Sequence, residues 1–246
     1  MSYSQSVVSG LPADREDSDD VVSEGPTFAR SSRGRLTHYD LGRFAGDTLF
    51  HRLARAVCEA GCLPRKELYE AWEVARRVRR LFRGGRVVDL AAGHGLLAHV
   101  LLLLDDSSPN AVAIDRHPAA SSAALHEALT RTWPRLRGRV RFERGALEAF
   151  ATLDGDVVVS SHACGALTDV ALEQATSVRA RVAVLPCCHH LASPDARKLA
   201  RWVDGALALD IARAHRLEQH GYRIWTQTIP RAITPKARLL LGAPVS

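Results

Sequence analysis

Two glycines and two carboxylates, placed around short apolar runs, form the first group of residues able to do chemistry. Gly93 and Gly95 follow an apolar run that ends in Asp89, and Asp115 ends a second apolar run 20 residues after Gly95. Glycines let the backbone turn sharply and approach a ligand where a Cβ would clash. A helix beginning near Gly95 presents free N–H groups, and Asp115 can accept hydrogen bonds from both hydroxyls of a ribose. The pattern predicts a sheet-based pocket for an adenosine-containing cofactor.

Two classes of cofactor are compatible with these residues. The run 93–98 fits the G-x-G-x-x-A fingerprint of nicotinamide-dependent oxidoreductases, with Asp115 at the expected distance. Asp89, four residues before Gly93, favours a different ligand. A carboxylate repels a pyrophosphate, whereas it attracts the ammonium and sulfonium groups of S-adenosylmethionine. We therefore expect Asp89, Gly93, Gly95 and Asp115 to line an S-adenosylmethionine site, with nicotinamide-dependent oxidoreduction as the alternative.

A second group, of histidines and cysteines, follows two later apolar runs. His162 and Cys164 come after the first run, and Cys187, Cys188, His189 and His190 come after the second. The carboxyl ends of neighbouring parallel strands meet at one edge of a sheet, where ligands bind, so we expect these groups to lie together.

Four roles are open for this group. A histidine can be the general base that deprotonates a hydroxyl or amine. Cys187 can form a covalent adduct with a pyrimidine ring, or the cysteines and histidines can bind zinc. The cysteines can also pack as small apolar side chains while the histidines shape the pocket. His162 is the first candidate for catalysis, with Cys164, Cys187 and His189 beside it.

The elements that position these residues follow from alternating patterns. From residue 86 onward, short β-branched runs alternate with helical segments, which predicts an α/β fold with a doubly wound parallel sheet. We expect strands at 86–90, 111–115, 139–143, 156–160 and 181–185, and helices near 96–104, 119–131, 166–177, 194–206 and 209–220. The last two strands, 222–229 and 237–242, are too closely joined for a helical crossover and should pair antiparallel. A seven-stranded sheet of this kind is typical of class I methyltransferases.

Three regions are expected along the chain. Residues 1–33 are rich in Ser, Asp, Gly and Pro, which predicts a disordered acidic tail. Amphipathic helices near 47–60 and 65–82 make residues 34–84 an N-terminal helical cap. Residues 85–246 then form the main domain.

Composition narrows the class of protein. The longest apolar run, 96–104, is interrupted by His99 and is too short to cross a bilayer. The chain opens without a charged-then-apolar leader, and its five cysteines are an odd number. We therefore expect a cytoplasmic protein with reduced thiols. Residues 1–25 carry a net charge of −5 and the remainder +11. A body this basic suits a polyanion such as RNA, although scattered arginines of an Arg-rich composition explain it equally well.

The residues from Asp89 to Gly95 resemble motif I of class I methyltransferases, D-x-G-x-G-x-G, with Ala91 in place of the first glycine. The pattern His162-x-Cys164-Gly165-x-x-Thr168-Asp169, followed by the run 187–190, resembles the motif pair of a methyltransferase-like domain family. That family includes the eukaryotic tRNA acceptor-stem ribose 2′-O-methyltransferases.

The resemblance covers roughly residues 85–192. It implies a Rossmann-like class I fold, S-adenosyl-L-methionine as cofactor, and RNA as acceptor, with tRNA the first candidate. A small-molecule acceptor is the second candidate, because no aromatic-rich RNA platform is visible. A non-catalytic binding protein that retains the cofactor fold is the third.

Overall fold

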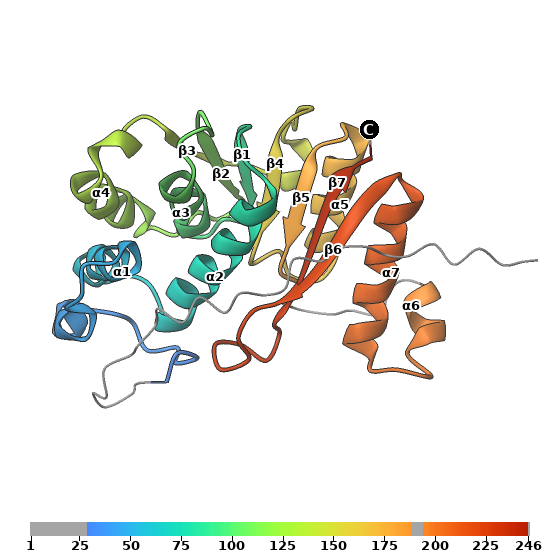
Figure 1. The fold of residues 1–246 in the computed structure, drawn as a ribbon, viewed down its shortest axis with the longest axis horizontal. Coiled ribbons are helices and arrows are strands. Elements are labelled where there is room, and N and C mark those ends of the chain that lie inside the picture. The colour runs from blue at the N-terminus through green and yellow to red at the C-terminus, as the bar shows by residue number, and fades with distance from the viewer. Residues whose placement is uncertain (1–28, 188–193, 246) are drawn as a thin grey trace, which may run out of the picture.

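A seven-stranded sheet organises the computed structural model, which describes residues 29–187 and 194–245. The strand order is β3-β2-β1-β4-β5-β7-β6 (Figure 1). The strands are β1 (Val87–Leu90), β2 (Ala111–Asp115), β3 (Val140–Arg144), β4 (Val157–Ser160), β5 (Arg181–Val184), β6 (Tyr222–Thr228) and β7 (Arg238–Pro244). The first five strands pair in parallel, and β7 pairs antiparallel with both β5 and β6. The predicted class of sheet, including its antiparallel last strand, is confirmed.

The order of the strands reverses beside β1. The chain runs outward from β1 through β2 to β3, then returns to place β4 and β5 on the other side of β1. Asp89 therefore lies opposite Ala113 on one neighbour and Val159 on the other. In open α/β sheets, ligands bind outside the carboxyl ends of the strands at such a reversal. The topology directs attention to the loops that follow β1 and β4.

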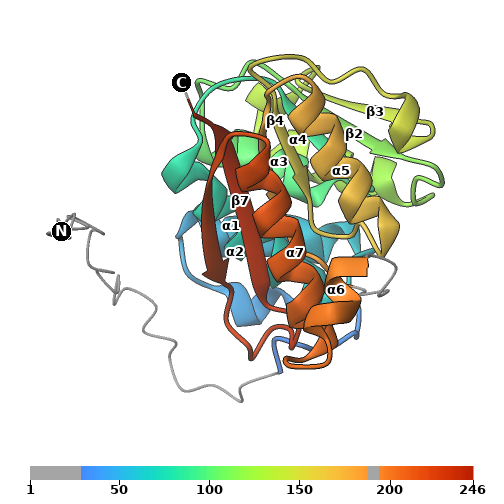
Figure 2. The same ribbon diagram turned by 90° about the vertical axis from the view of Figure 1, so that its right-hand side faces the viewer.

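Helices cover both faces of the sheet, as Figures 1 and 2 show together. Alternate strand residues enter two cores: Val87 and Val157 face one, and Val88 and Val158 face the other. The first core is covered by α1 (Leu49–Ala60), α2 (Arg65–Leu81), α3 (Leu96–Leu104) and α4 (Ser122–Thr132). The second is covered by α5 (Ala166–Ser177) and α7 (Gly205–Gln219), with α6 (Pro194–Leu199) packed against α7. Short 3₁₀ turns occur at His38–Phe44, Pro134–Leu136 and Leu147–Ala149.

The two N-terminal helices share a core with the sheet. Leu53 of α1 and Val74 of α2 are fully buried in the cluster that also holds Val87 of β1. A buried ion pair fixes α2 further, because the Arg79 guanidinium lies 3.1 Å from the Asp105 carboxylate. Arg79 also donates to the carbonyl of Leu101 on α3. The carboxyl-terminal end of α2 is therefore held in a defined place.

One predicted helix is wrong in extent. The segment 194–206 is not continuous, since α6 ends at Leu199 and α7 begins at Gly205. Asp204 explains the break, because its side chain accepts a hydrogen bond from the Leu207 backbone N–H and caps α7. The helix predicted from residue 209 therefore begins four residues earlier. Most of the predicted tail, residues 1–28, lies outside the described residues. In the described part, every helix is too short or too polar to traverse a lipid bilayer.

Candidate active site

The loop between β1 and α3 is built from three residues with left-handed backbone. Ala91 has φ 56°, Gly93 has φ 56° and Gly95 has φ 72°. A Cβ on Gly95 would lie 2.7 Å from a ring carbon of Phe142, so any larger residue would force that ring to shift. A Cβ on Gly93 would meet no atom within 4 Å. Ala91 adopts this conformation at a cost of roughly 1–2 kcal/mol, which explains why methyltransferase motif I has glycine there.

Asp115 is joined to this loop. One carboxylate oxygen accepts from the Gly93 backbone N–H at 2.9 Å, and the other accepts from the His117 N–H at 2.8 Å. The residue stands half-exposed at the carboxyl end of β2. Each carboxylate oxygen can accept more than one hydrogen bond, so capacity remains for two ligand hydroxyls. The contact with Gly93 fixes the carboxylate beside the glycine turn.

Asp89 lies beneath the loop. Its side chain is buried, and Oδ2 accepts from the Ala98 N–H of α3 at 3.2 Å. Burial raises the pKa of Asp89 to about 8, and the nearby Asp115 adds to this, against the lowering effect of the Ala98 hydrogen bond. The sequence predicts a carboxylate floor to the site. The structure places this side chain beneath the loop as a buried anchor for the start of α3, where burial favours the protonated form.

The glycine turn also carries His94, which the sequence analysis did not single out. Its Nε2 lies 3.1 Å from the Ser121 hydroxyl, and its Nδ1 lies 3.7 Å from Glu67 on α2. Burial raises the pKa of Glu67, but the hydrogen bond from His94 and the charge of His162 outweigh it, so the pKa is lowered overall. In the sequence, the only indication that these residues belong to the site was that Glu67 lies in the first turn of a predicted helix.

His162 lines two cavities. The smaller, about 10 Å³ in volume and enough for one water, is lined by residues that include Glu67, His94 and His162. The larger is a cleft of about 200 Å³ that His162 also lines. Ser160 sets the position of this residue, because its hydroxyl donates to the Leu90 carbonyl and accepts from the Ala163 N–H. The turn after β4 is thereby tied to the end of β1.

The cleft is assembled from distant parts of the chain. Its lining comprises Ser31, Arg33, Lys66, Glu70, Ser161, His162, Leu185, Cys187, Ile233, Thr234, Pro235 and Lys236. These residues come from the segment before α2, the first turns of α2, the ends of β4 and β5, and the β6–β7 loop. The sequence predicts His162 and Cys187 here, but it does not predict Arg33 and Lys66 beside them.

The predicted histidine and cysteine groups come together in part. Cys164 Sγ lies 2.6 Å from Cys187 Sγ, which joins the ends of β4 and β5 as the topology requires. Cys188, His189 and His190 lie outside the described residues. Among residues 29–187 and 194–245, no three His, Cys, Asp or Glu side chains are arranged to hold a metal ion. The general-base, covalent and zinc roles of this group stay predictions.

The middle of the chain matches a known protein family. Residues 66–195 match the family described as "Methyltransferase domain". No curated protein has a significantly matching sequence. An O-methyltransferase family protein from Burkholderia thailandensis is 20% identical, with a TM-score of 0.50 over 87% of this chain and 65% of that one. At this identity the likeness shows the fold alone, and this chain spans only those 65% of its neighbour's length.

Two further solved structures have lower TM-scores. A Pyrococcus abyssi tRNA (uracil-54, C5)-methyltransferase in complex with S-adenosyl-L-homocysteine is 16% identical, with a TM-score of 0.43 over 72% of this chain and 38% of that one. TrmK of M. capricolum, in complex with S-adenosyl-homocysteine, is 13% identical, with a TM-score of 0.43 over 69% and 66%. Neither likeness is strong enough to carry an argument about this chain.

Proposed function

The chain belongs to the methyltransferase domain family, and we propose that it transfers the methyl group of S-adenosylmethionine to an acceptor held beside His162. One observation carries this proposal: His162, next to Ser161, lines both a small cavity at the glycine turn and a larger cleft. A group in that position faces the donor on one side and the acceptor on the other. The family match favours this activity over nicotinamide-dependent oxidoreduction.

The residues of the β1–α3 loop fit the donor. Gly93 leaves open space where a side chain would stand, and the half-exposed Asp115 carboxylate is available to ribose hydroxyls. Gly95 and Ala91 shape the turn, and Asp89 holds the start of α3 from below. S-adenosylmethionine supplies an electrophilic methyl group on a positively charged sulfur. The loop orients this molecule through backbone N–H groups and Asp115 rather than through cationic side chains.

His162 is the proposed general base. Its imidazole takes the proton from an acceptor hydroxyl or amine as that atom attacks the methyl carbon. Glu67 and His94 lie around the same small cavity. Cys164, Cys187 and His189 remain proposed site residues. In the covalent alternative, Cys187, which lines the cleft, is the nucleophile that adds to a pyrimidine ring.

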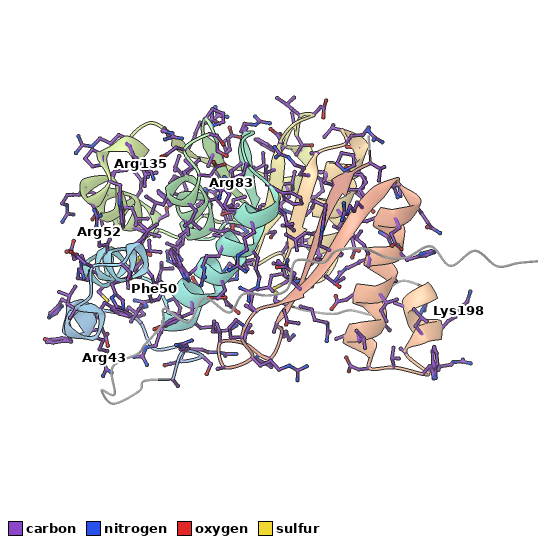
Figure 3. The ribbon with its side chains drawn as sticks, in the orientation of Figure 1. Arg43, Phe50, Arg52, Arg83, Arg135 and Lys198 are labelled. Carbon is purple, nitrogen blue, oxygen red and sulfur yellow. The ribbon has the colours of Figure 1, made fainter. Side chains whose placement is uncertain are left out.

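Two acceptor classes have separate support. RNA, with tRNA first, is supported by the net charge of +11 that residues 26–246 carry. The basic side chains are nevertheless dispersed, as Arg43, Arg52, Arg83, Arg135 and Lys198 show in Figure 3. A small molecule is supported by the cleft, whose volume of about 200 Å³ encloses one ring system rather than a nucleic-acid strand. An exposed ribose or base of an RNA would fill the same space. We also propose a cytoplasmic location, in line with the odd number of cysteines.

A labelling experiment tests the proposed function. The full chain is incubated with S-adenosylmethionine carrying a labelled methyl group, together with either total RNA or a small-metabolite extract. We expect label in one of the two pools and a loss of that label in the His162→Asn variant. Label in neither pool, with donor binding intact in calorimetry, would support the non-catalytic binding protein instead.

A further inference from the structure

Three cationic side chains from separate segments converge on the cleft. Arg33 precedes α2, Lys66 is the second residue of α2, and Lys236 lies in the β6–β7 loop. Among the described residues of the lining, Glu70 is the one carboxylate. The lysine, arginine and glutamate side chains of this described lining therefore sum to a charge of +2. A cleft whose walls have one sign of charge concentrates ligands of the opposite sign.

The pairing of these cations is incomplete. Lys66 Nζ lies 3.1 Å from the buried Glu70 carboxylate, which neutralises it in part. Within the described part of the chain, the side chains of Arg33 and Lys236 have no carboxylate within 4.0 Å. Other cations are paired closely with carboxylates, as in Arg79 with Asp105 and Arg213 with Asp169. Arg33 and Lys236 therefore keep their charge available to a ligand in the cleft.

The backbone beneath these side chains is held in place. The carbonyls of Ser32 and Gly34 accept from the first N–H groups of α2, at 3.1 and 3.0 Å, which fixes the segment that carries Arg33. In the hairpin loop, Thr234 is buried and its hydroxyl accepts from the Lys236 N–H at 3.3 Å. The cations that line the cleft are therefore carried by anchored backbone from separate segments of the chain.

We propose that this cleft binds a phosphate group of the methyl acceptor, so that the acceptor is a phosphate-bearing molecule. A phosphate presents oxygens in several directions, which matches donors on three walls better than the two coplanar oxygens of a carboxylate do. The phosphate lies between Arg33, Lys66 and Lys236, and the atom to be methylated lies toward His162 in the same cleft. This inference rests on the proposed function for its acceptor, but its binding site stands on the lining residues alone.

A binding experiment with matched variants tests the site. Inorganic phosphate is titrated into the full chain and followed by calorimetry. The double variant Arg33→Ala/Lys236→Ala is compared with Arg80→Ala/Arg137→Ala, which removes two exposed arginines that do not line the cleft. We expect the cleft variant to bind at least about tenfold more weakly and the control to bind as wild type does. Equal weakening in both variants, or none in either, would overturn the proposal.

Two further probes identify the source of the phosphate. Ribose 5-phosphate represents a small phosphorylated acceptor, and a short oligoribonucleotide of uridines represents RNA. Competition of either probe with inorganic phosphate, lost in the cleft variant, supports the proposal and names the class. For RNA the affinity should also fall steeply with added salt. Failure of both probes to compete would contradict a phosphate-bearing acceptor.

The same samples separate this inference from the proposed function. S-adenosylmethionine should bind the cleft variant as tightly as it binds wild type, because Arg33 and Lys236 do not belong to the β1–α3 loop. Donor binding without phosphate binding would overturn only the cleft assignment. Phosphate binding without donor binding would overturn the proposed methyltransferase activity and leave the anion site in place.

Discussion

The site at the carboxyl edge of the sheet has two halves that are built in different ways. The donor half is the β1–α3 loop with Asp115, and the acceptor half is the cleft that His162 and Cys187 line. The donor half uses residues from one short stretch, and its polar groups bond to backbone: Asp115 to Gly93, and Asp89 to Ala98. The acceptor half gathers side chains from five parts of the chain, and two of its cations have no carboxylate partner among the described residues. The polar groups of the first half are paired within the protein, whereas we propose that the second half receives its counter-charge from a ligand.

A pair of histidines shows the same contrast. His99 on α3 is fully buried, with Nδ1 2.7 Å from the Gly95 carbonyl and Nε2 3.0 Å from His126. Burial lowers the pKa of His99 to about 4, so this ring stays neutral and supports the glycine turn. His162 instead borders two cavities. His99 therefore serves the structure of the glycine turn, whereas His162 is the residue for which we propose a catalytic role.

The largest expected effect is on catalysis, from His162→Asn. Loss of a general base should lower the rate of methyl transfer by about 10²–10⁴-fold while donor affinity stays unchanged. The rate is measured as label incorporated into the responsive acceptor pool. His215→Asn, at an exposed position on α7, is the control. A rate within about twofold of wild type would remove His162 from the mechanism.

The next effect concerns Asp89→Asn and the pH dependence of stability. Because the folded-state pKa of Asp89 is raised from 3.8 to about 8, the stability that its protonated form contributes is full below pH 4 and is lost as the pH rises to 8. The asparagine side chain cannot ionise. The free energy of unfolding of this variant should therefore rise relative to that of wild type by about 3–5 kcal/mol between pH 4 and pH 8. Urea unfolding at pH 4 and pH 8 measures this. If the free energies of unfolding of the two proteins change by the same amount between the two pH values, Asp89 is not buried as described.

Two glycine substitutions sharpen the comparison within the donor half. Gly93→Ala and Gly95→Ala both place a Cβ on left-handed backbone, which costs about 1 kcal/mol. Only Gly95→Ala also collides with Phe142, so it should lose about 1–3 kcal/mol more in chemical denaturation. Gly93→Ala should fold and yet bind S-adenosylmethionine weakly, because its methyl group enters the open space of the loop. Equal stabilities for the two variants would show that Phe142 moves aside.

The smallest effect is expected for Glu67→Gln. Glu67 lies on α2 and lines the small cavity beside His94 and His162. The lowered pKa of Glu67 means that its ionised form stabilises the fold above pH 4.5, and that this contribution is lost as the pH falls further. The glutamine variant should be less stable by about 1 kcal/mol at pH 7 and equal to wild type near pH 3. Thermal unfolding at the two pH values checks this. A difference that persists at low pH would point to packing rather than charge.

The two halves also differ in how far they could be predicted from the sequence. The donor half could be predicted because Asp89, Gly93, Gly95 and Asp115 lie within 27 residues and their roles depend on backbone conformation. The sheet could be predicted because strand and helix patterns alternate regularly from residue 86. His162 and Cys187 could be brought together because they end neighbouring strands.

The remaining residues escaped prediction for physical reasons. Arg33 and Lys66 read as ordinary exposed charges, and only the packing of α2 against the core places them at the cleft. The burial of Asp89, which changes its charge state, depends on α3 covering the end of β1. The break after Leu199 depends on Asp204 capping α7, a local signal outweighed in the sequence by the continuous helical pattern.

The most direct test of the account is calorimetric binding of S-adenosylmethionine to wild type and to Asp115→Ala, with NAD(H) titrated in parallel. We predict that wild type binds S-adenosylmethionine and not NAD(H), and that Asp115→Ala binds it at least about tenfold more weakly, because the ribose hydroxyls lose their acceptor. Unchanged affinity in the variant, or tight binding of NAD(H) by wild type, would contradict the assignment of the donor site.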